Sequence, residues 1–125
     1  MITVKDWMSK PIISVKPGTT VQEAADIMAK HNIGSMLVSE DGKKAKGIVT
    51  ERDILKKILA AQQDPKAVKV EQIMTKKVIT VDVKTSLLEI SKIMTKNIMR
   101  RIVVTEKGNM IGIVTARDLL QLMAG

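Results

Sequence analysis

The 125-residue chain contains no cysteine, no phenylalanine and no tyrosine. The lack of cysteine excludes disulfide bonds, thiolate metal sites and cysteine nucleophiles. His31 is the only histidine, which excludes a metal site built from several histidines. Trp7 is the only aromatic residue, which argues against a surface that stacks the bases of a single-stranded nucleic acid. We therefore expect no metal site.

The chain also lacks long hydrophobic runs. No apolar stretch reaches the roughly 18–20 residues that a membrane-spanning helix needs, and residues 1–6 lack the layout of a signal peptide. We therefore expect a cytoplasmic protein with no membrane partner. Hydrophobic residues make up 45% and charged residues 27% of the chain, which is typical of a folded protein. This length suits one compact domain or two small repeats that share one core.

Positive charge dominates what is there. Lysine and arginine total 21 against 13 acidic residues, for a formal net charge of +8. Such a surface attracts a nucleotide, a nucleic acid or an acidic partner, although a merely solvated lysine-rich surface has the same composition. No expected helix carries a stripe of lysine and arginine, and no groove-reading motif is present, so nucleic-acid binding is possible but not favoured. No pair of catalytic groups or phosphate-binding glycine loop is present, so we expect no enzyme.

An internal repeat organises the chain. When the sequence is shifted by 66 residues, 11 of the 35 positions in 4–38 match those in 70–104. After a one-residue slip, the motif at 47–53 (Gly-Ile-Val-Thr-Glu-Arg-Asp) aligns with that at 112–118 (Gly-Ile-Val-Thr-Ala-Arg-Asp). We predict a first unit over 1–62, a linker over 63–69 and a second unit over 70–125.

Each repeat predicts the order strand, helix, strand, strand, helix. In the first copy, Thr20 is predicted to be a helix N-cap and Glu23 to close a capping box, and Ser86 and Glu89 repeat this pattern. Apolar residues then recur at helical spacing, and short apolar strands flank a glycine turn. The last helix of the first copy begins near Glu51 and is expected to carry four apolar residues on one face: Ile54, Leu55, Ile58 and Leu59. Met8 and Met74, each from the segment before a repeat, are expected to fill the same core.

These repeated motifs resemble a tandem pair of cystathionine-β-synthase (CBS) domains, also called a Bateman module. The resemblance rests on Asp-Trp-Met-Ser at 6–9, Ile-Ser-Val at 13–15 and the doubled motif that starts at Gly47 and Gly112. It implies an α/β fold of two β-α-β-β-α units that pack sheet to sheet, with ligand clefts between them. It also implies a regulatory module that binds AMP, ADP or ATP, forms a homodimer and modulates a separate partner protein. Alternatives are a sensor of S-adenosylmethionine or NAD, or a nucleic-acid-binding protein that uses its basic surface.

The resemblance also assigns residues to two clefts. In this family the aspartate that opens the last helix accepts ribose hydroxyls, the threonine before it bonds ribose or phosphate, and the first strand holds adenine. The first cleft would then contain Ile12, Ile13, Ser14, Thr50, Arg52, Asp53, Arg100 and Arg101. The second, weaker cleft would contain Val78, Ile79, Thr80, Gly34, Ser35, Thr115, Arg117 and Asp118.

The repeats differ where the resemblance places a phosphate contact. The first copy has Gly34 and Ser35 where the second has Arg100 and Arg101. Guanidinium groups bind phosphate by paired, charge-assisted hydrogen bonds, whereas glycine and serine offer only neutral donors. We therefore predict that the cleft of Asp53 prefers a phosphorylated nucleotide and that the cleft of Asp118 is weak, empty or suited to a less charged adenosine ligand. The alternative for the two arginines is a solvated basic pair at the start of a strand.

A purely structural role is open for the repeated motif itself. Thr50 and Asp53, like Thr115 and Asp118, have the spacing of a capping box with aspartate in place of glutamate. Such residues stabilise a helix start whether or not a ligand binds. The threonines therefore serve as caps, as ligand contacts or as both.

Overall fold

The computed structural model describes residues 4–8 and 12–124, so Ser9 of the Asp-Trp-Met-Ser motif and the two outermost positions of the predicted units, 1 and 125, lie outside the described residues. The contacts divide the chain into two compact units, with boundaries after Ile12 and after Val78. We call residues 13–78 the central unit, and the N-terminal segment together with residues from Ile79 onward the terminal unit. Both are mixed α/β units with the order β-α-β-β-α, which confirms the predicted fold class.

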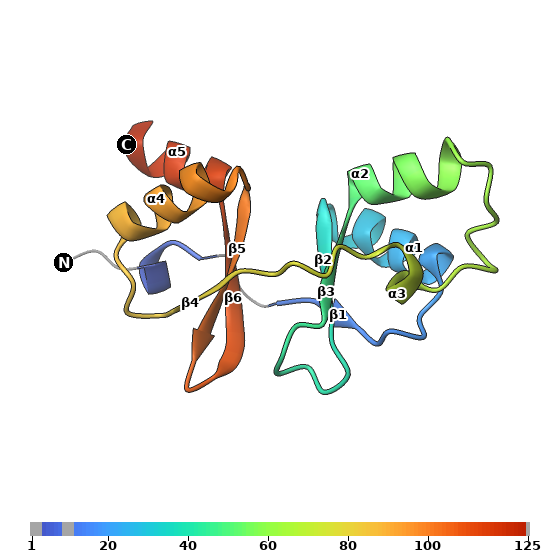
Figure 1. Ribbon diagram of the computed structural model, residues 1–125, viewed down its shortest axis with the longest axis horizontal. Coiled ribbons are helices and arrows are strands. Elements are labelled where there is room, and N and C mark those ends of the chain that lie inside the picture. Colours follow the sequence, from blue (N-terminus) through green and yellow to red (C-terminus); the bar gives the residue numbers. More distant parts are fainter. Residues whose placement is uncertain (1–3, 9–11, 125) are drawn as a thin grey trace. The chain divides into compact units, whose positions relative to one another are not determined.

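The central unit is a three-stranded sheet with its two main helices on one face (Figure 1). Strand β1 runs parallel to β2, which pairs antiparallel with β3. The helix that follows β3 starts as α2 and continues as a π-helix, η2. Its elements are β1 (Ser14–Val15), α1 (Val21–His31), β2 (Ser35–Val38), β3 (Gly47–Thr50), α2 (Glu51–Ile54), η2 (Leu55–Leu59) and α3 (Val70–Ile73).

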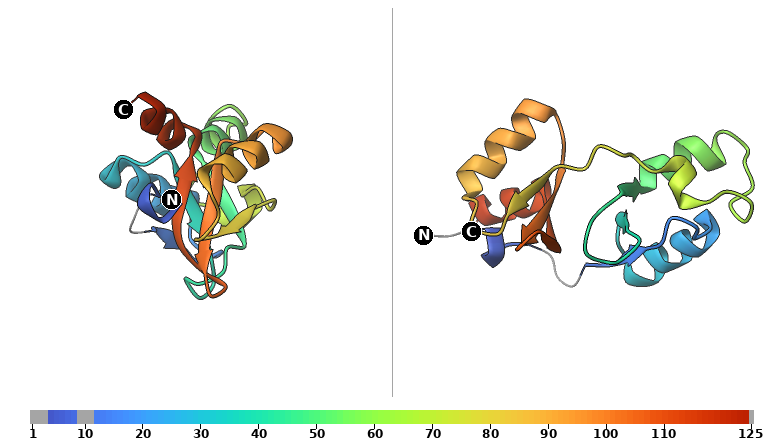
Figure 2. Two further views of the ribbon diagram at one scale, coloured as in Figure 1. Left: turned by 90° about the vertical axis from the view of Figure 1, so that its left-hand side faces the viewer. Right: turned by 60° about the horizontal axis from the view of Figure 1, so that its bottom comes forward.

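The terminal unit repeats this topology. Strands β4 and β5 are parallel, β5 and β6 are antiparallel, and helices α4 and α5 cover one face of the sheet (Figure 2). Its elements are η1 (Val4–Asp6), β4 (Thr80–Asp82), α4 (Leu87–Asn97), β5 (Arg101–Glu106), β6 (Asn109–Thr115) and α5 (Ala116–Ala124). No helix within the described parts of either unit is long and apolar enough to cross a membrane.

The predicted N-caps are confirmed, but among the described residues neither Glu23 nor Glu89 makes the return bond to the cap amide that would complete the predicted capping boxes. The Thr20 side chain accepts a hydrogen bond from the backbone of Glu23 at 3.1 Å, and Ser86 accepts one from Glu89 at the same distance. Each bond satisfies an amide that the first helical turn leaves without a partner. The apolar stripe of each following helix is buried against its sheet.

The apolar face predicted for the helix after Glu51 is buried only in part. Ile58 is buried, with 1% of its surface exposed, but Leu55 and Leu59 are 57% and 62% exposed. The helix changes register here, because the amide of Ala60 donates to the carbonyl of Leu55, five residues earlier, at 2.8 Å. This π-turn adds a residue to the turn and changes which side chains face the core.

The segments that precede the two repeats are exchanged between the cores. Val70 packs in the core of the central unit, and its amide donates to the carbonyl of Thr19 at 2.8 Å. Val4 packs in the core of the terminal unit, and its amide donates to the carbonyl of Thr85 at 3.3 Å. The compact units therefore do not begin and end where the sequence repeats do.

The expectation that Met8 and Met74 fill the same core is wrong. Met8 belongs to the core of the terminal unit, and Met74 packs against that of the central unit. Each methionine covers the glycine that opens the repeated motif. A Cβ atom added at Gly47 would lie 2.8 Å from Met74 Cγ, and one added at Gly112 would lie 2.8 Å from Met8 Cγ. The absence of a side chain at each glycine therefore makes room for a methionine from the exchanged segment.

Candidate functional site

At the start of α2, in the central unit, Thr50 and Asp53 form reciprocal hydrogen bonds. The Thr50 side chain accepts from the backbone of Asp53 at 3.1 Å, and the Thr50 amide donates to Asp53 Oδ2 at 2.9 Å. The Thr50 hydroxyl also donates to Asp53 Oδ2, at 3.1 Å. These bonds form the complete capping box expected from the motif. The capping role is therefore real, and it fixes the orientation of the Asp53 carboxylate.

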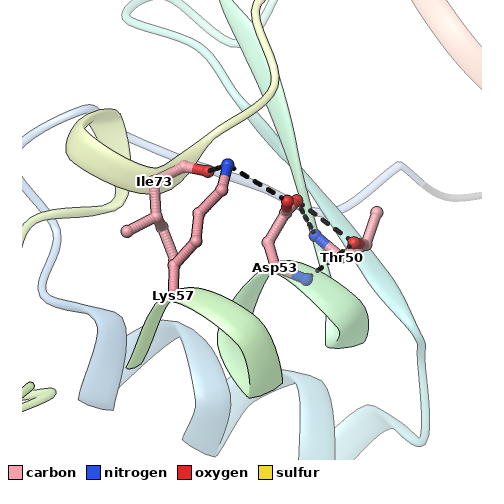
Figure 3. Close-up of polar contacts among 4 residues, drawn as sticks. All are labelled: Thr50, Asp53, Lys57 and Ile73. Atoms are coloured by element: carbon pink, nitrogen blue, oxygen red, sulfur yellow. Dashed lines mark hydrogen bonds and ion pairs between the residues drawn. The ribbon is translucent and has the colours of Figure 1, made fainter. Parts of the chain in front are cut away.

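Lys57 completes this cluster from the next turn of the helix. Its Nζ lies 3.3 Å from Asp53 Oδ1 and donates to the carbonyl of Ile73 at 2.7 Å. Figure 3 shows the ammonium group between the Asp53 carboxylate and the carbonyl at the end of α3. The side chain of Asp53 is 13% exposed and that of Lys57 is 40% exposed. The carboxylate is thus largely enclosed, while its cationic partner still meets solvent.

The corresponding cluster in the terminal unit is simpler. The Thr115 amide donates to Asp118 Oδ2 at 2.9 Å, and the Thr115 side chain accepts from the Asp118 amide at 3.1 Å. Leu122 stands four residues after Asp118, where the central unit has Lys57 four residues after Asp53. Helix α5 is an ordinary α-helix throughout its described length, with no π-turn. The caps are therefore repeated, but the lysine four residues after the aspartate is not.

The central unit brings three predicted site residues to one face of its sheet. Ser35 pairs with Thr50, and Ser14 pairs with Leu37 in the same register. The neighbouring Met36 and Val38 lie in the helix-covered core, and side chains alternate along a strand. Ser14, Ser35 and Thr50 therefore occupy the face opposite the helices. Ile13, in contrast, packs against the helix-covered core, and its carbonyl accepts from the Leu37 amide at 3.4 Å.

The terminal unit has the same arrangement with different chemistry. Arg101 pairs with Thr115, and Thr80 pairs with Val103. Because Ile102 and Val104 lie in the helix-covered core, Arg101, Thr80 and Thr115 share the opposite face. Within this unit Arg101 is thus the cross-strand neighbour of Thr115, where the central unit has Ser35.

The remaining predicted residues take backbone or exposed positions. The carbonyl of Gly34 accepts from the Glu51 amide at 3.0 Å, and that of Arg100 accepts from the Ala116 amide at 2.8 Å. A Cβ atom added at Gly34 would collide with the carboxylate of Glu51. The exposed positions are those of Arg52, Arg100 and Arg117, and the half-buried ones are Ile12, Val78 and Ile79.

Each compact unit contains residues from both predicted clefts, which the sequence repeat alone does not indicate. Ile13, Ser14, Thr50, Arg52 and Asp53 lie in the central unit, together with Gly34, Ser35 and Val78 of the second set. Ile79, Thr80, Thr115, Arg117 and Asp118 lie in the terminal unit, together with Ile12, Arg100 and Arg101 of the first set.

Lys57 is the residue that sequence reasoning missed. A signal for it was present, since an acidic residue followed by a lysine four positions later is a favourable pair on a helix. Its second partner, the carbonyl of Ile73, had no such signal, because that contact depends on where the exchanged segment packs. Across residues 4–8 and 12–124 there is no group of three or more acidic or histidine side chains that could hold a metal ion.

Comparison with known proteins agrees with these features. The CBS domain family matches residues 4–60 and again residues 70–125. The CBS domain-containing protein YhcV of Bacillus subtilis is 34% identical over 119 residues, which are 95% of this chain and 84% of YhcV. A crystal structure of the CBS domain protein NE2398 superposes with a TM-score of 0.88 at 30% identity, over 99% of this chain and 98% of that one.

A third relative was solved with ligands. The CBS domain pair of protein MJ0100, in complex with 5′-methylthioadenosine and S-adenosyl-L-methionine, superposes with a TM-score of 0.86 at 33% identity. The similarity covers 100% of this chain and 98% of that one. With two matched family segments, two units of the same topology and a doubled Thr-x-x-Asp cap, the chain belongs to the CBS domain family and carries a pair of CBS domains.

Proposed function

We propose that this CBS domain pair is a regulatory module that binds an adenosine nucleotide, AMP, ADP or ATP, and modulates a separate partner protein. The observation that carries the proposal is the doubled Thr-x-x-Asp cap. Each cap fixes a carboxylate at the point where a strand ends and the last helix of the unit begins. A carboxylate accepts hydrogen bonds at two oxygens, which suits the neighbouring hydroxyls of a ribose.

Adenosine chemistry is supported by the relative MJ0100, whose CBS pair holds two adenosine-derived ligands. The net charge of +8 favours a phosphorylated ligand over an uncharged one. In this proposal Asp53 and Asp118 accept ribose hydroxyls, and Arg100 and Arg101 contribute positive charge for a phosphate. S-adenosylmethionine is the second candidate ligand, because MJ0100 binds it and because Leu122 stands four residues after Asp118, where Lys57 follows Asp53.

Calorimetric titration tests the proposal directly. AMP, ATP and S-adenosylmethionine are titrated into protein that has first been shown to be free of bound nucleotide. We expect saturable binding of a phosphorylated adenosine that Asp53→Asn weakens at least tenfold, since the amide loses the charge and one acceptor. The matched control is Asp64→Asn, which removes one charge from an exposed loop of the same unit. Equal affinity in Asp53→Asn and Asp64→Asn would contradict the assignment of Asp53.

The same titrations separate the other proposals. Replacing both Arg100 and Arg101 by alanine is expected to weaken AMP and ATP more than S-adenosylmethionine. Binding of S-adenosylmethionine alone would keep the module and discard the role of the arginines. No binding of any of these ligands, combined with retention on DNA or RNA at moderate salt, would favour the basic surface as the functional one.

A homodimer is part of the proposal. Leu55 and Leu59 on the helix after β3, and Leu120 and Met123 on α5, are all more than half exposed. Large apolar side chains on helices favour burial against another surface, and a second copy of the chain supplies one of matching chemistry. Sedimentation equilibrium is expected to give twice the 13.8 kDa mass of the chain, and Leu55→Glu combined with Leu120→Glu is expected to give the single mass.

A further inference from the structure

We propose that Lys57 determines which adenosine ligands bind at Asp53, favouring ligands that carry a negative group. Asp118, with Leu122 in the corresponding place, lacks this preference. The inference rests on the proposed function, in which both carboxylates accept ribose hydroxyls. It is independent of Arg100 and Arg101, because it uses contacts within the central unit only.

The first step is the number of acceptor positions left on Asp53. An ionised carboxylate has about four lone-pair positions, two on each oxygen. Two of them, on Oδ2, accept from the amide and hydroxyl of Thr50, and a third, on Oδ1, faces Lys57 at 3.3 Å. One position remains, so a ligand that presents two ribose hydroxyls must displace Lys57 from Oδ1 or turn the Thr50 hydroxyl away.

Asp118 differs in this count. Among the contacts of the described residues, its carboxylate accepts only from the Thr115 amide, at 2.9 Å. Three of its four positions are therefore not used by hydrogen bonds among the described residues. Binding at Asp118 thus favours the diol itself, whatever charge the rest of the ligand carries.

The second step is that Lys57 stays nearby when a hydroxyl takes its place. The ion pair with Asp53 is long and partly exposed, and such pairs are weak. The bond from Lys57 to the carbonyl of Ile73 is shorter, at 2.7 Å, and does not involve the carboxylate. A hydroxyl that replaces Lys57 on Oδ1 therefore leaves the ammonium group beside the ligand, held at the end of α3 (Figure 3).

The third step is the charge that a ligand meets. At Asp53 the negative carboxylate is matched by the positive ammonium group, whereas the Asp118 carboxylate has no lysine at the corresponding position. A phosphate near an uncompensated carboxylate is repelled, and a nearby ammonium group offsets this repulsion. With screening by solvent and salt, one such charge changes affinity several-fold.

The π-helix η2 supports a role beyond simple helix stabilisation. It spans Leu55–Leu59 and so includes Lys57, whereas α5 has no such turn at the equivalent place. Single π-turns occur often at functional sites. The irregular turn and the lysine therefore occur together, and only beside Asp53.

The test compares adenosine with AMP, which differ by the phosphate. Both are titrated by calorimetry into protein that carries Asp118→Asn, so that Asp53 is the carboxylate under observation. We expect Lys57→Met to lower the ratio of AMP affinity to adenosine affinity by about three- to tenfold. Lys56→Met, which removes an equal charge from the exposed neighbouring residue, is expected to leave the ratio unchanged, and Lys57→Arg is expected to restore it.

The reciprocal variant covers the case in which Lys57→Met fails to fold. Leu122→Lys is made in protein that carries Asp53→Asn, and it is expected to raise the ratio of AMP to adenosine affinity at Asp118. An equal ratio in Lys57→Met and Lys56→Met overturns the role of Lys57 while leaving the proposed function intact. Absence of binding of both adenosine and AMP to the unmodified protein overturns the proposed function and the role of Lys57 together.

Discussion

The two Thr-x-x-Asp caps share a backbone frame and differ in their surroundings. In both units the threonine and aspartate exchange hydrogen bonds of 2.9 and 3.1 Å. Beyond the cap, the central unit adds Lys57 and a π-turn, whereas the terminal unit continues as an ordinary helix with Leu122. Repetition has thus kept the geometry that positions each carboxylate, while the charge beside it has diverged. Two similar frames can therefore differ in ligand preference.

The largest expected difference between the two units comes from the exchanged segments, which contribute one buried valine to each core. Val70 and Val4 are both fully buried, and replacing either by alanine is expected to cost about 2 kcal/mol of stability. Val70→Ala should lower amide hydrogen-exchange protection in β3 more than in β6, and Val4→Ala should do the reverse. If Val70→Ala instead lowered protection in β6 more than in β3, the assignment of the Val70 segment to the central unit would be contradicted.

The two glycines that open the repeated motif are expected to differ in how well they tolerate a side chain. An added Cβ atom at Gly47 would lie 3.0 Å from the backbone oxygen of Thr75, whereas the three atoms nearest to one at Gly112 all belong to the Met8 side chain. We expect Gly47→Ala to cost about 1–3 kcal/mol and Gly112→Ala less, because a methionine side chain can move. Urea unfolding measures both.

Gly18→Ala is the matched control for these variants. No atom lies within 4 Å of a Cβ added at Gly18, and its surface is exposed. Alanine there is expected to leave stability unchanged or to raise it slightly, because it restricts the unfolded chain. A cost at Gly18 equal to that at Gly47 would show that the loss arises from something other than the close contact.

The caps give a smaller difference. Thr50→Ala and Thr115→Ala are each expected to cost about 1 kcal/mol, with the larger loss at Thr50. The Thr50 hydroxyl both accepts from the Asp53 amide and donates to its carboxylate, whereas the Thr115 hydroxyl accepts from the Asp118 amide. Serine at either position keeps the hydroxyl and is expected to retain most of the stability. Thermal unfolding of the four variants reports the order.

The hairpins provide the smallest effect, and it depends on pH. The central hairpin is closed by Asp41, and hydrogen bonds from the amides of Lys43 and Lys44 lower its pKa below the usual 3.8. A lowered pKa means that this contribution to stability is complete above the unfolded pKa and is lost as the pH falls through the folded pKa. The stability difference between the natural protein and Asp41→Asn should therefore shrink below about pH 4.

The terminal hairpin is the internal reference for that measurement. It turns through Lys107 and Gly108, with φ angles of 53° and 83°, which is the geometry of a two-residue type I′ turn. Hydrogen exchange at pH 3 is expected to show loosening at the central hairpin before the terminal one. If hydrogen exchange showed that Asp41→Asn loosens both hairpins to the same extent, the role of the Asp41 carboxylate in stabilising the central hairpin would be contradicted.

Much of the fold follows from local sequence signals. Thr20 and Ser86 at helix starts, and the doubled motif after Gly47 and Gly112, specify caps and turns through contacts only a few residues apart. Such contacts are visible in a sequence, because the spacing of the residues determines them. The β-α-β-β-α order of both units and the capping box at Thr50 were predicted on this basis.

The features that could not be predicted depend on contacts between distant residues. The repeat aligns Val70 with Val4, but it does not say which core either residue joins. The π-turn at Leu55–Leu59 contains no proline or glycine that would mark it in the sequence, so helical periodicity did not distinguish the exposed Leu55 and Leu59 from the buried Ile58. For the same reason, the second partner of Lys57 became visible only with the position of α3.

The exchange of segments has a consequence for the order in which the chain can fold during synthesis. The central unit is continuous from Ile13 to Val78, so every residue of its core has been made before β4 is translated. The terminal unit needs Val4 at one end and Val114 at the other, and its first piece must wait for more than a hundred further residues. Because the chain is synthesised from its N-terminus, the central unit can fold as soon as it has emerged from the ribosome, before the terminal unit is complete. Fluorescence or force measurements on stalled nascent chains would show one folding event soon after Val78 emerges and a second only near the C-terminus.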